Sequence, residues 1–431
     1  MPHPSPRPPA PGPSHPALAP IDSAEHRAWL TDQFHRLVAF SRQAVDPAGG
    51  FDYLDTDGTP MPGRDRELYI TCRMTYVFAL AHLSGVPGAD GPVRHGLTAL
   101  SGLFHDDRNG GWHSAVAADG SVVPGRKEAY GHAFVLLAAA TATAAGIDGA
   151  DVLLDRALDI FDRHFWDDEA GLVRESFAAD FTDDEPYRGA NSNMHSVEAL
   201  LAAAGSLGAP VLAERTGRIC AVLIDRHARA GGWSLPEHYD QDWTALPEYN
   251  KDAPRHPFRP YGSTIGHWFE WARLLAQSEF ALDQDGVGAT AWMVPAAVEL
   301  FDHGVTSGWS ADGVEGFVYT LDWDLRPVAG ERMHWVVTEA IAAAAALYRR
   351  TGEERFHVWY QRLWQHAVAY FVEEGTGTWR HELDADLREV GAVWPGRPDA
   401  YHAAGALLIP QLPLTASLAG SILAAKALAA D

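Results

Sequence analysis

The stretch YGHAFVLLAAATATAA, residues 130–145, decides the fold class of this chain, because it contains no Asp, Glu, Lys or Arg and is rich in alanine. Alanine has the highest helix propensity of all residues and lets neighbouring helices approach closely. Residues 340–347 have the same character. Outward from these two stretches, apolar segments with helical spacing alternate with connectors rich in Gly, Pro and Asp. The pattern predicts a mainly helical protein.

The helical segments follow one another in six pairs. We expect twelve helices, near residues 24–44, 68–84, 90–104, 127–145, 149–164, 191–206, 209–228, 263–281, 286–302, 333–351, 354–372 and 397–409 with its continuation. The pairs begin about sixty residues apart, and helices of this length suit a closed ring of helical hairpins. We therefore expect an all-α fold, an (α/α)6 barrel in which inner and outer helices alternate. An open helical solenoid is the alternative, because a sequence does not show closure.

Composition divides the chain into a tail and one domain. The first twenty residues contain nine prolines, so we expect residues 1–21 to form a disordered, polyproline-like tail. No linker-like break interrupts residues 22–431, which we expect to form a single barrel domain. Short β-hairpins are expected in three connectors, which begin at Gly110, Gly316 and Thr378 and turn at Asp119-Gly120, Asp324-Leu325 and Asp384-Ala385.

The chain is strongly acidic: 33 Lys and Arg against 57 Asp and Glu give a formal net charge of −24. Such a protein repels nucleic acid and anionic membranes, so neither is an expected partner. Only Cys72 and Cys220 could form a disulfide, and no signal peptide or membrane span is apparent. Nucleotide-binding glycine motifs, C-x-x-C and H-E-x-x-H are missing, so no cofactor is expected. We expect a soluble cytoplasmic protein that is a monomer or a homodimer.

Ionisable residues recur near the start of every second helix, within otherwise apolar sequence. They are Arg73, His132, His195 with Glu198, His267 with Glu270, Glu339, and His402. In a closed barrel these helix ends would converge on one pocket, whereas in an open array they would follow a groove. Arg73 lies in an apolar run, so it requires an anion, several hydroxyl oxygens or an internal carboxylate as its partner.

Two of these helices repeat the spacing H-x-x-E, as His195 with Glu198 and His267 with Glu270. Residues three apart share a helix face, and Trp and Phe surround the second pair. Aromatic rings beside a charged pair are typical of a sugar site, although a core histidine paired with its own glutamate gives the same pattern. His402 lies in a first helical turn, where the positive helix end favours a neutral imidazole. A capping role is the alternative for His402.

Five blocks of sequence, in order and at similar spacing, resemble the N-acylglucosamine 2-epimerase superfamily, and within it the branch of mannose and sulfoquinovose isomerases. The blocks are ITCRM from Ile70, NSNMHSVEA from Asn191, YNKDAPRHPFRPYGSTIGHWFEWARL from Tyr249, DWDLRPV from Asp322 and GRPDAYHAAGALLIP from Gly396. The resemblance covers residues 24–425. It implies an (α/α)6 barrel, in agreement with the helix pattern.

The resemblance implies sugar chemistry without a redox cofactor or a metal, in which a proton moves at carbon 2 of an open-chain aldose through a cis-enediolate. It implies that His267 and His402 are the acid/base pair, with Glu270 beside His267. Histidine suits this task because its pKa lies near neutral pH. The residues expected to bind substrate are Arg73, Asn191, His195, Glu198, Arg259, Trp335, Glu339 and His381.

Three positions differ from the sulfoquinovose-type pattern: Tyr69 replaces a tryptophan, and His381 and Pro398 replace glutamines. These differences remove polar groups that could serve a sulfonate, whereas RPYG and WRHEL are closer to the mannose isomerases. The expected reaction is D-mannose to D-fructose, with D-lyxose to D-xylulose as a slower one. The alternative is a sulfoquinovose isomerase, or a 2-epimerase of mannose, cellobiose or N-acylglucosamine that uses the same intermediate.

Functions of other classes also fit parts of the pattern. Two H-x-x-E pairs with Glu339 resemble the ligands of di-iron helical bundles, although there the order of the residues is reversed. A glycoside hydrolase would use paired carboxylates on the same barrel, but the prominent candidates here are histidines. A sugar-binding or protein-binding role without turnover is the third alternative.

Overall fold

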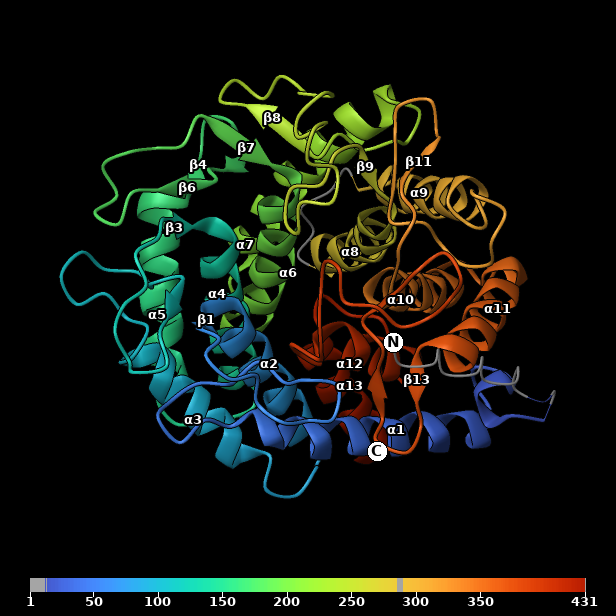
Figure 1. Ribbon diagram of the computed structural model, residues 1–431, viewed down its shortest axis with the longest axis horizontal. Coiled ribbons are helices and arrows are strands. Elements are labelled where there is room, and N and C mark those ends of the chain that lie inside the picture. The colour runs from blue at the N-terminus through green and yellow to red at the C-terminus, as the bar shows by residue number, and fades with distance from the viewer. Residues whose placement is uncertain (1–11, 13, 285–289, 431) are drawn as a thin grey trace, which may run out of the picture.

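Six inner helices form a closed ring in the computed structural model, which describes residues 12, 14–284 and 290–430. They are α2 (Leu68–Leu83), α4 (Ala129–Ala144), α6 (Ala190–Leu207), α8 (Ile265–Gln284), α10 (His334–Thr351) and α12 (Tyr401–Leu408). Each contacts the next, and α12 returns to α2 (Figure 1). The alanine-rich α4 and α10 are buried around most of their circumference, as helices without a polar face must be.

Outer helices cover the ring and complete six helical hairpins. They are α1 (Ala24–Ser41), α3 (Asp90–Ser101), α5 (Ala150–Ile160), α7 (Pro210–Cys220), α9 (Met293–Ser307) and α11 (Glu354–Tyr370). Helix α1 packs on α12, and each of the others packs on the inner helix that precedes it. The additional helix α13 (Leu418–Ala430) contacts α2, α4 and α6. The predicted (α/α)6 barrel is therefore confirmed, and the open solenoid is wrong.

Several predicted boundaries need correction. The helix expected at 286–302 begins at Met293, and residues 285–289 lie outside the described part. The helix expected from 397 begins only at Tyr401, whose N–H donates a hydrogen bond to the Asp399 side chain at 2.9 Å. Helices α5 and α7 continue as π-helical turns over Phe161–Phe165 and Ala221–Ala228.

Only part of the predicted tail, residues 1–21, lies within the described residues. Residues 1–11 and 13 lie outside the described part, but residues 14–21 pack on the barrel and include a 3₁₀ turn at Pro16–Leu18. Ala17 and Ile21 are buried, and the Pro16 carbonyl lies 3.0 Å from the His26 ring nitrogen Nδ1. The tail prediction is wrong for residues 14–21, because their 3₁₀ turn packs against α1 and α11.

Short antiparallel strands join the connectors at one end of the barrel. The pairs are β1 (Arg66–Glu67) with β2 (Ala115–Val116), β3 (Lys127–Glu128) with β6 (Ser176–Phe177), β7 (Tyr187–Gly189) with β8 (His238–Asp240), β9 (Ser263–Thr264) with β10 (Thr320–Leu321), and β12 (Arg332–Met333) with β15 (Glu382–Leu383). A bridge between Leu54 and Arg397 completes the circle. Five inner helices begin directly after such a strand, so their N-termini meet at the same rim.

The remaining strands form local hairpins. They are β4 (Trp166–Asp167) with β5 (Leu172–Val173), β10 with β11 (Pro327–Ala329), and β13 (Val372–Glu373) with β14 (Thr378–Trp379). The predicted turns at Asp119-Gly120, Asp324-Leu325 and Asp384-Ala385 are each closed by pairing across them. The three predicted hairpins are therefore confirmed.

One turn recurs in all six connectors, and the sequence prediction found only half of its copies. In each copy an aspartate precedes a residue whose φ lies between 60° and 87°. Those residues are Gly58, Gly120, Phe181, Trp243, Leu325 and Leu387. Glycine adopts such angles freely, but the larger residues do so only when the surrounding structure holds them there. Among the described residues, no helix is both long and apolar enough to cross a membrane.

Candidate active site

The inner helices surround a cavity at the rim where they begin. The side chains that line it include Tyr69, Arg73, Tyr130, Asn191, His195, His267, Glu270, His334, Trp335 and His402 from the helices, and Phe258, Tyr319, His381, Trp394, Pro398 and Asp399 from the connectors. All six inner helices therefore contribute to one pocket. Of the ionisable residues expected to converge, Arg73, His195, His267, Glu270 and His402 do so.

His267 is oriented by a carboxylate that the sequence prediction missed. Its Nδ1 lies 2.9 Å from Oε2 of the buried Glu237, whose Oε1 accepts a hydrogen bond from the Thr264 N–H. A carboxylate can only accept here, so Nδ1 carries the proton and the lone pair of the neutral ring is on Nε2. This Nε2 has no hydrogen bond within the described residues, and the ring lines the cavity. His267 is thereby arranged as a base.

His402, on α12, has the same arrangement. Its Nδ1 lies 2.9 Å from Oε1 of Glu339, and both side chains are buried. Burial, followed by the positive charge of Arg73, holds the pKa of His402 well below its ordinary value. The imidazole is therefore neutral, with its Nε2 lone pair available.

Trp335 lies between the two histidines. Its ring centroid is 5.2 Å from that of His267 and 5.6 Å from that of His402. The close approach of Trp335 to α8 requires a glycine, because a Cβ on Gly266 would lie 2.1 Å from the indole ring. An aromatic surface between two acid/base groups suits the apolar face of a sugar.

Arg73 forms the polar wall of the cavity together with Asp399, another residue that the sequence prediction missed. The guanidinium donates to Asp399 at 3.0 Å and to the Tyr130 hydroxyl at 2.9 Å. Burial alone would raise the pKa of Asp399, but Arg73, His402 and the Tyr401 N–H together lower it. The ion pair therefore persists, and it fixes the arginine at the cavity surface.

His195 and Glu270 face each other, which corrects the expectation that Glu270 lies beside His267. Oε1 of Glu270 is 3.7 Å from Nδ1 of His195, and the His195 ring packs on Phe134. Burial and the nearby Glu339 raise the pKa of Glu270 well above its ordinary value. Burial and Arg73 lower the pKa of His195. Both pKa shifts favour the uncharged forms of the two side chains.

Glu198 and Glu339 lie beneath the cavity, not on its surface, which corrects their predicted role in substrate binding. Both contact the buried Arg273, and the Tyr401 hydroxyl donates to Glu198. His132 also lies away from the cavity, because its two ring nitrogens are used by the Trp112 N–H and the Glu128 carbonyl. His132 is therefore a buried structural histidine, and the expectation that it joins the pocket is wrong.

His381 lines the cavity as predicted, and it stacks on His334, a neighbour that the sequence prediction missed. Their ring centroids are 3.8 Å apart. Burial lowers the pKa of His334 to about 4 and that of His381 well below its ordinary value, so both rings are neutral.

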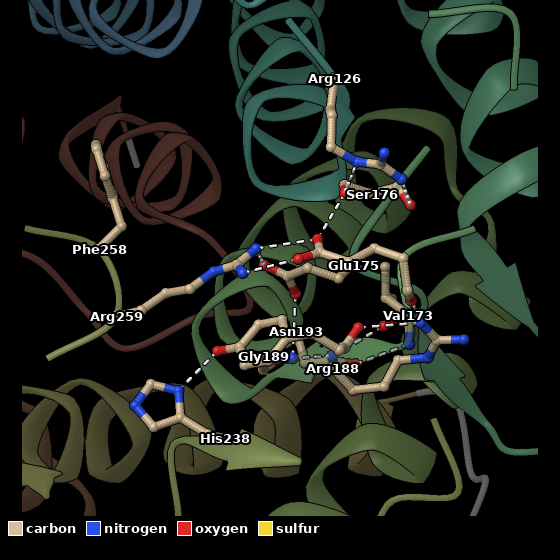
Figure 2. Close-up of polar contacts among 12 residues, drawn as sticks. Arg126, Val173, Glu175, Ser176, Arg188, Gly189, Asn193, His238, Phe258 and Arg259 are labelled. Atoms are coloured by element: carbon tan, nitrogen blue, oxygen red, sulfur yellow. Dashed lines mark hydrogen bonds and ion pairs between the residues drawn. The ribbon is translucent and has the colours of Figure 1, made fainter. Parts of the chain in front are cut away.

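Arg259 does not line the cavity, although its neighbour Phe258 does (Figure 2). The guanidinium donates to both oxygens of Glu185, at 2.8 and 3.1 Å, and stacks 3.9 Å above the Tyr187 ring. A bidentate carboxylate pair holds an arginine strongly. The prediction that Arg259 binds substrate is therefore corrected. The residue anchors the loop that carries Phe258, whose ring centroid lies 5.3 Å from that of Trp394 at the cavity.

Replacing Glu175, beside Arg259 in Figure 2, should flatten the pH dependence of stability. Burial raises the pKa of Glu175 to about 7 from 4.5, although Arg259 acts to lower it. A raised carboxyl pKa gives stability that is complete below pH 4.5 and is lost as the pH rises through 7. Between pH 5 and pH 8, urea unfolding should show that the free energy of unfolding falls by about 3 kcal/mol less in Glu175→Gln than in the parental enzyme. The exposed control Glu169→Gln should keep the parental slope, and an equal slope in both variants would refute the prediction.

Two groups of described side chains have the spacing of metal ligands: His195, Glu198 and Glu270, and Glu270, Glu339 and His402. Arg273 contacts all three of these carboxylates, at 3.2 to 3.5 Å. Its positive charge lies among the carboxylates and would repel a divalent cation. The arrangement therefore favours acid/base chemistry over a metal centre.

The structure is an (α/α)6 barrel whose cavity is lined by two histidines, each bound through Nδ1 to a buried carboxylate. The family model for N-acylglucosamine 2-epimerase matches residues 49–406. The chain is 51% identical over 400 residues to D-mannose isomerase of Thermobifida fusca, covering 93% of this chain and 97% of that protein. It is 43% identical over 402 residues to D-mannose isomerase of Pseudomonas cannabina pv. alisalensis, covering 93% and 96%.

Solved structures of similar proteins have the same fold. A crystal structure of D-mannose isomerase superposes with a TM-score of 0.82 at 28% identity, over 89% of this chain and 97% of that one. Cellobiose 2-epimerase from Spirochaeta thermophila DSM 6192 superposes with a TM-score of 0.78 at 20% identity, over 96% and 100%, and shows the same fold. The chain belongs to the N-acylglucosamine 2-epimerase family and is an isomerase.

Proposed function

We propose that this enzyme interconverts D-mannose and D-fructose by proton transfer between carbons 2 and 1 through a cis-enediolate. The observation that carries the proposal is the pair His267 and His402, each bound through Nδ1 to a buried carboxylate and each lining the same cavity. The relatives that are 51% and 43% identical are named D-mannose isomerase, which supports mannose as the substrate.

The chemistry follows from the orientation of the two rings, each of which has its Nδ1 on a buried carboxylate. One Nε2 removes the proton from carbon 2 of the open-chain aldose, and the hydroxyl proton of oxygen 2 passes to oxygen 1. A proton returned to carbon 1 then gives the ketose. The enediolate carries negative charge, which Arg73 at the cavity wall can stabilise in a site with little water. Return of the proton to the other face of carbon 2 would give the epimer, so the two reactions share one intermediate.

Ring opening must precede proton transfer, and His195 with Glu270 suits this step. Glu270 carries a proton that it can donate to the ring oxygen, and neutral His195 can accept the proton of the anomeric hydroxyl. Both side chains are at the cavity surface.

Buried polar atoms at the cavity are suited to the hydroxyl groups of a sugar. Tyr69 Oη, Arg73 Nε, Asn191 Oδ1, His195 Nδ1 and Glu270 Oε2 have no hydrogen-bond partner among the described residues. A buried polar atom without a partner is costly, so a ligand that supplies hydroxyl groups gains affinity there. We therefore propose a monosaccharide as the substrate, with neither a metal nor a redox cofactor in the reaction.

Proton NMR of the purified enzyme with D-mannose and excess chelator tests this function. We expect fructose signals, and slower conversion of D-lyxose to D-xylulose. Glucose as the main first product would instead make the enzyme a 2-epimerase that uses the same cavity. Turnover of cellobiose, N-acylglucosamine or sulfoquinovose with no reaction of mannose would contradict the proposed substrate.

A further inference from the structure

Arg273 is a buried arginine on the barrel axis that the proposed reaction does not use. It lies on α8, one helical turn after Glu270, and its side chain is 5% exposed. It is separated from the cavity by Glu270, since Arg273 does not line the cavity and Glu270 does. A buried charge of this kind is expensive unless its partners are well placed.

The partners of Arg273 come from three inner helices. Its Nε and one terminal nitrogen each lie 3.2 Å from Oε2 of Glu339 on α10. The other terminal nitrogen lies 3.3 Å from Glu198 on α6 and 2.9 Å from the side-chain oxygen of Gln277. The contact with Glu270 is longer, at 3.5 Å. The fork of the guanidinium is therefore directed mainly at Glu339.

Glu339 connects this fork to the catalytic pair. One of its oxygens faces Arg273, and the other lies 2.9 Å from Nδ1 of His402. Glu339 therefore orients His402, and Arg273 holds Glu339, as in other catalytic groups where a third residue fixes the residue that orients the base. His267 has no such arginine: the second oxygen of its carboxylate, Glu237, accepts the backbone N–H of Thr264.

We propose that Arg273 is a positioning residue for the isomerisation, which holds Glu339 in the orientation that fixes the tautomer and direction of His402. The inference rests on the proposed function of His402. The role requires an arginine, because only a planar fork places two donors on one carboxylate while it also reaches Glu198. A lysine would keep the charge and lose this geometry.

Arg273→Lys tests the proposal, with Arg66→Lys as the matched control. Arg66 is also a buried arginine, but it bonds Asp46 and backbone carbonyls away from the cavity. We expect Arg273→Lys to lower kcat for mannose by about 100-fold with KM changed less than about threefold, as a catalytic group displaced by about 1 Å would. Arg66→Lys should lower the melting temperature and leave kcat unchanged. A parental kcat in Arg273→Lys would overturn the proposal.

A second readout needs no substrate, so it separates this proposal from the choice of mannose. The Nδ1 proton of His402 on Glu339 should give a low-field proton NMR signal in the parental enzyme, assigned by its loss in His402→Gln. We expect Arg273→Lys to shift or remove this signal. If that variant does not fold, the charge-balanced Arg273→Gln/Glu198→Gln replaces it with the same expectation. Absence of the signal from the parental enzyme, or an unchanged signal in the variant, would overturn the proposal.

Discussion

Replacement of His402 by glutamine should lower kcat for D-mannose by about 10⁴-fold, because the variant lacks the group that exchanges a proton with the substrate. His267→Gln should have an effect of similar size, since each ring serves one side of the transfer. The double variant should be little worse than either single one, because the two groups act as a unit. Initial rates of fructose formation measure all three.

The fold should survive these changes. His402 and His267 each make one side-chain hydrogen bond, and glutamine can replace it. Circular dichroism and melting temperature close to those of the parental enzyme would show that the loss is chemical. A single variant that keeps more than about a tenth of the parental kcat would contradict the role given to that histidine, since general acid/base catalysis contributes at least 100-fold.

Replacement of Glu237 by glutamine should lower kcat by about 10³-fold, the second largest effect that we expect. The carboxylate accepts the Nδ1 proton of His267 and the backbone N–H of Thr264. An amide can satisfy only one of these with its oxygen, and its NH₂ group would face the imidazole and favour the wrong tautomer. The lone pair would then no longer point to the sugar.

A matched control is available outside the cavity. Glu315 lies 3.4 Å from Nδ1 of the buried His366, so Glu315→Gln removes a similar charge beside a similar ring. We expect a parental kcat in this variant. Equal rates for Glu237→Gln and the parental enzyme would show that His267 does not depend on its carboxylate.

The barrel could be predicted from the sequence because its strongest signals are local. Alanine-rich α4 and α10 are helical by propensity and lack a polar face, which places them inside. Two copies of the connector turn were harder to find, because Phe181 and Trp243 have positive φ angles that local preference disfavours. The packing of residues 14–21 depends on distant partners such as Gln361, which donates to the Leu18 carbonyl at 3.2 Å.

The candidate site was predictable where a residue lies on an inner helix near the rim. His267, His402 and Arg73 were found by their place in apolar helix starts. Glu237 was not, because it is 30 residues from His267 and lies just before a strand that the sequence did not predict. The role of Arg259 was predicted wrongly, because the sequence does not show that Glu185 binds this residue.

The central claim is that a proton, and not a hydride, moves between carbons 2 and 1 of mannose on histidine bases. Proton NMR of D-mannose in D2O with the enzyme and excess chelator tests it most directly. The account predicts fructose, with deuterium entering carbon 1 over repeated turnovers, because a histidine proton exchanges with solvent. Fructose that stays fully protiated at carbon 1 after many turnovers would contradict the enediolate, and absence of any reaction would contradict mannose as the substrate.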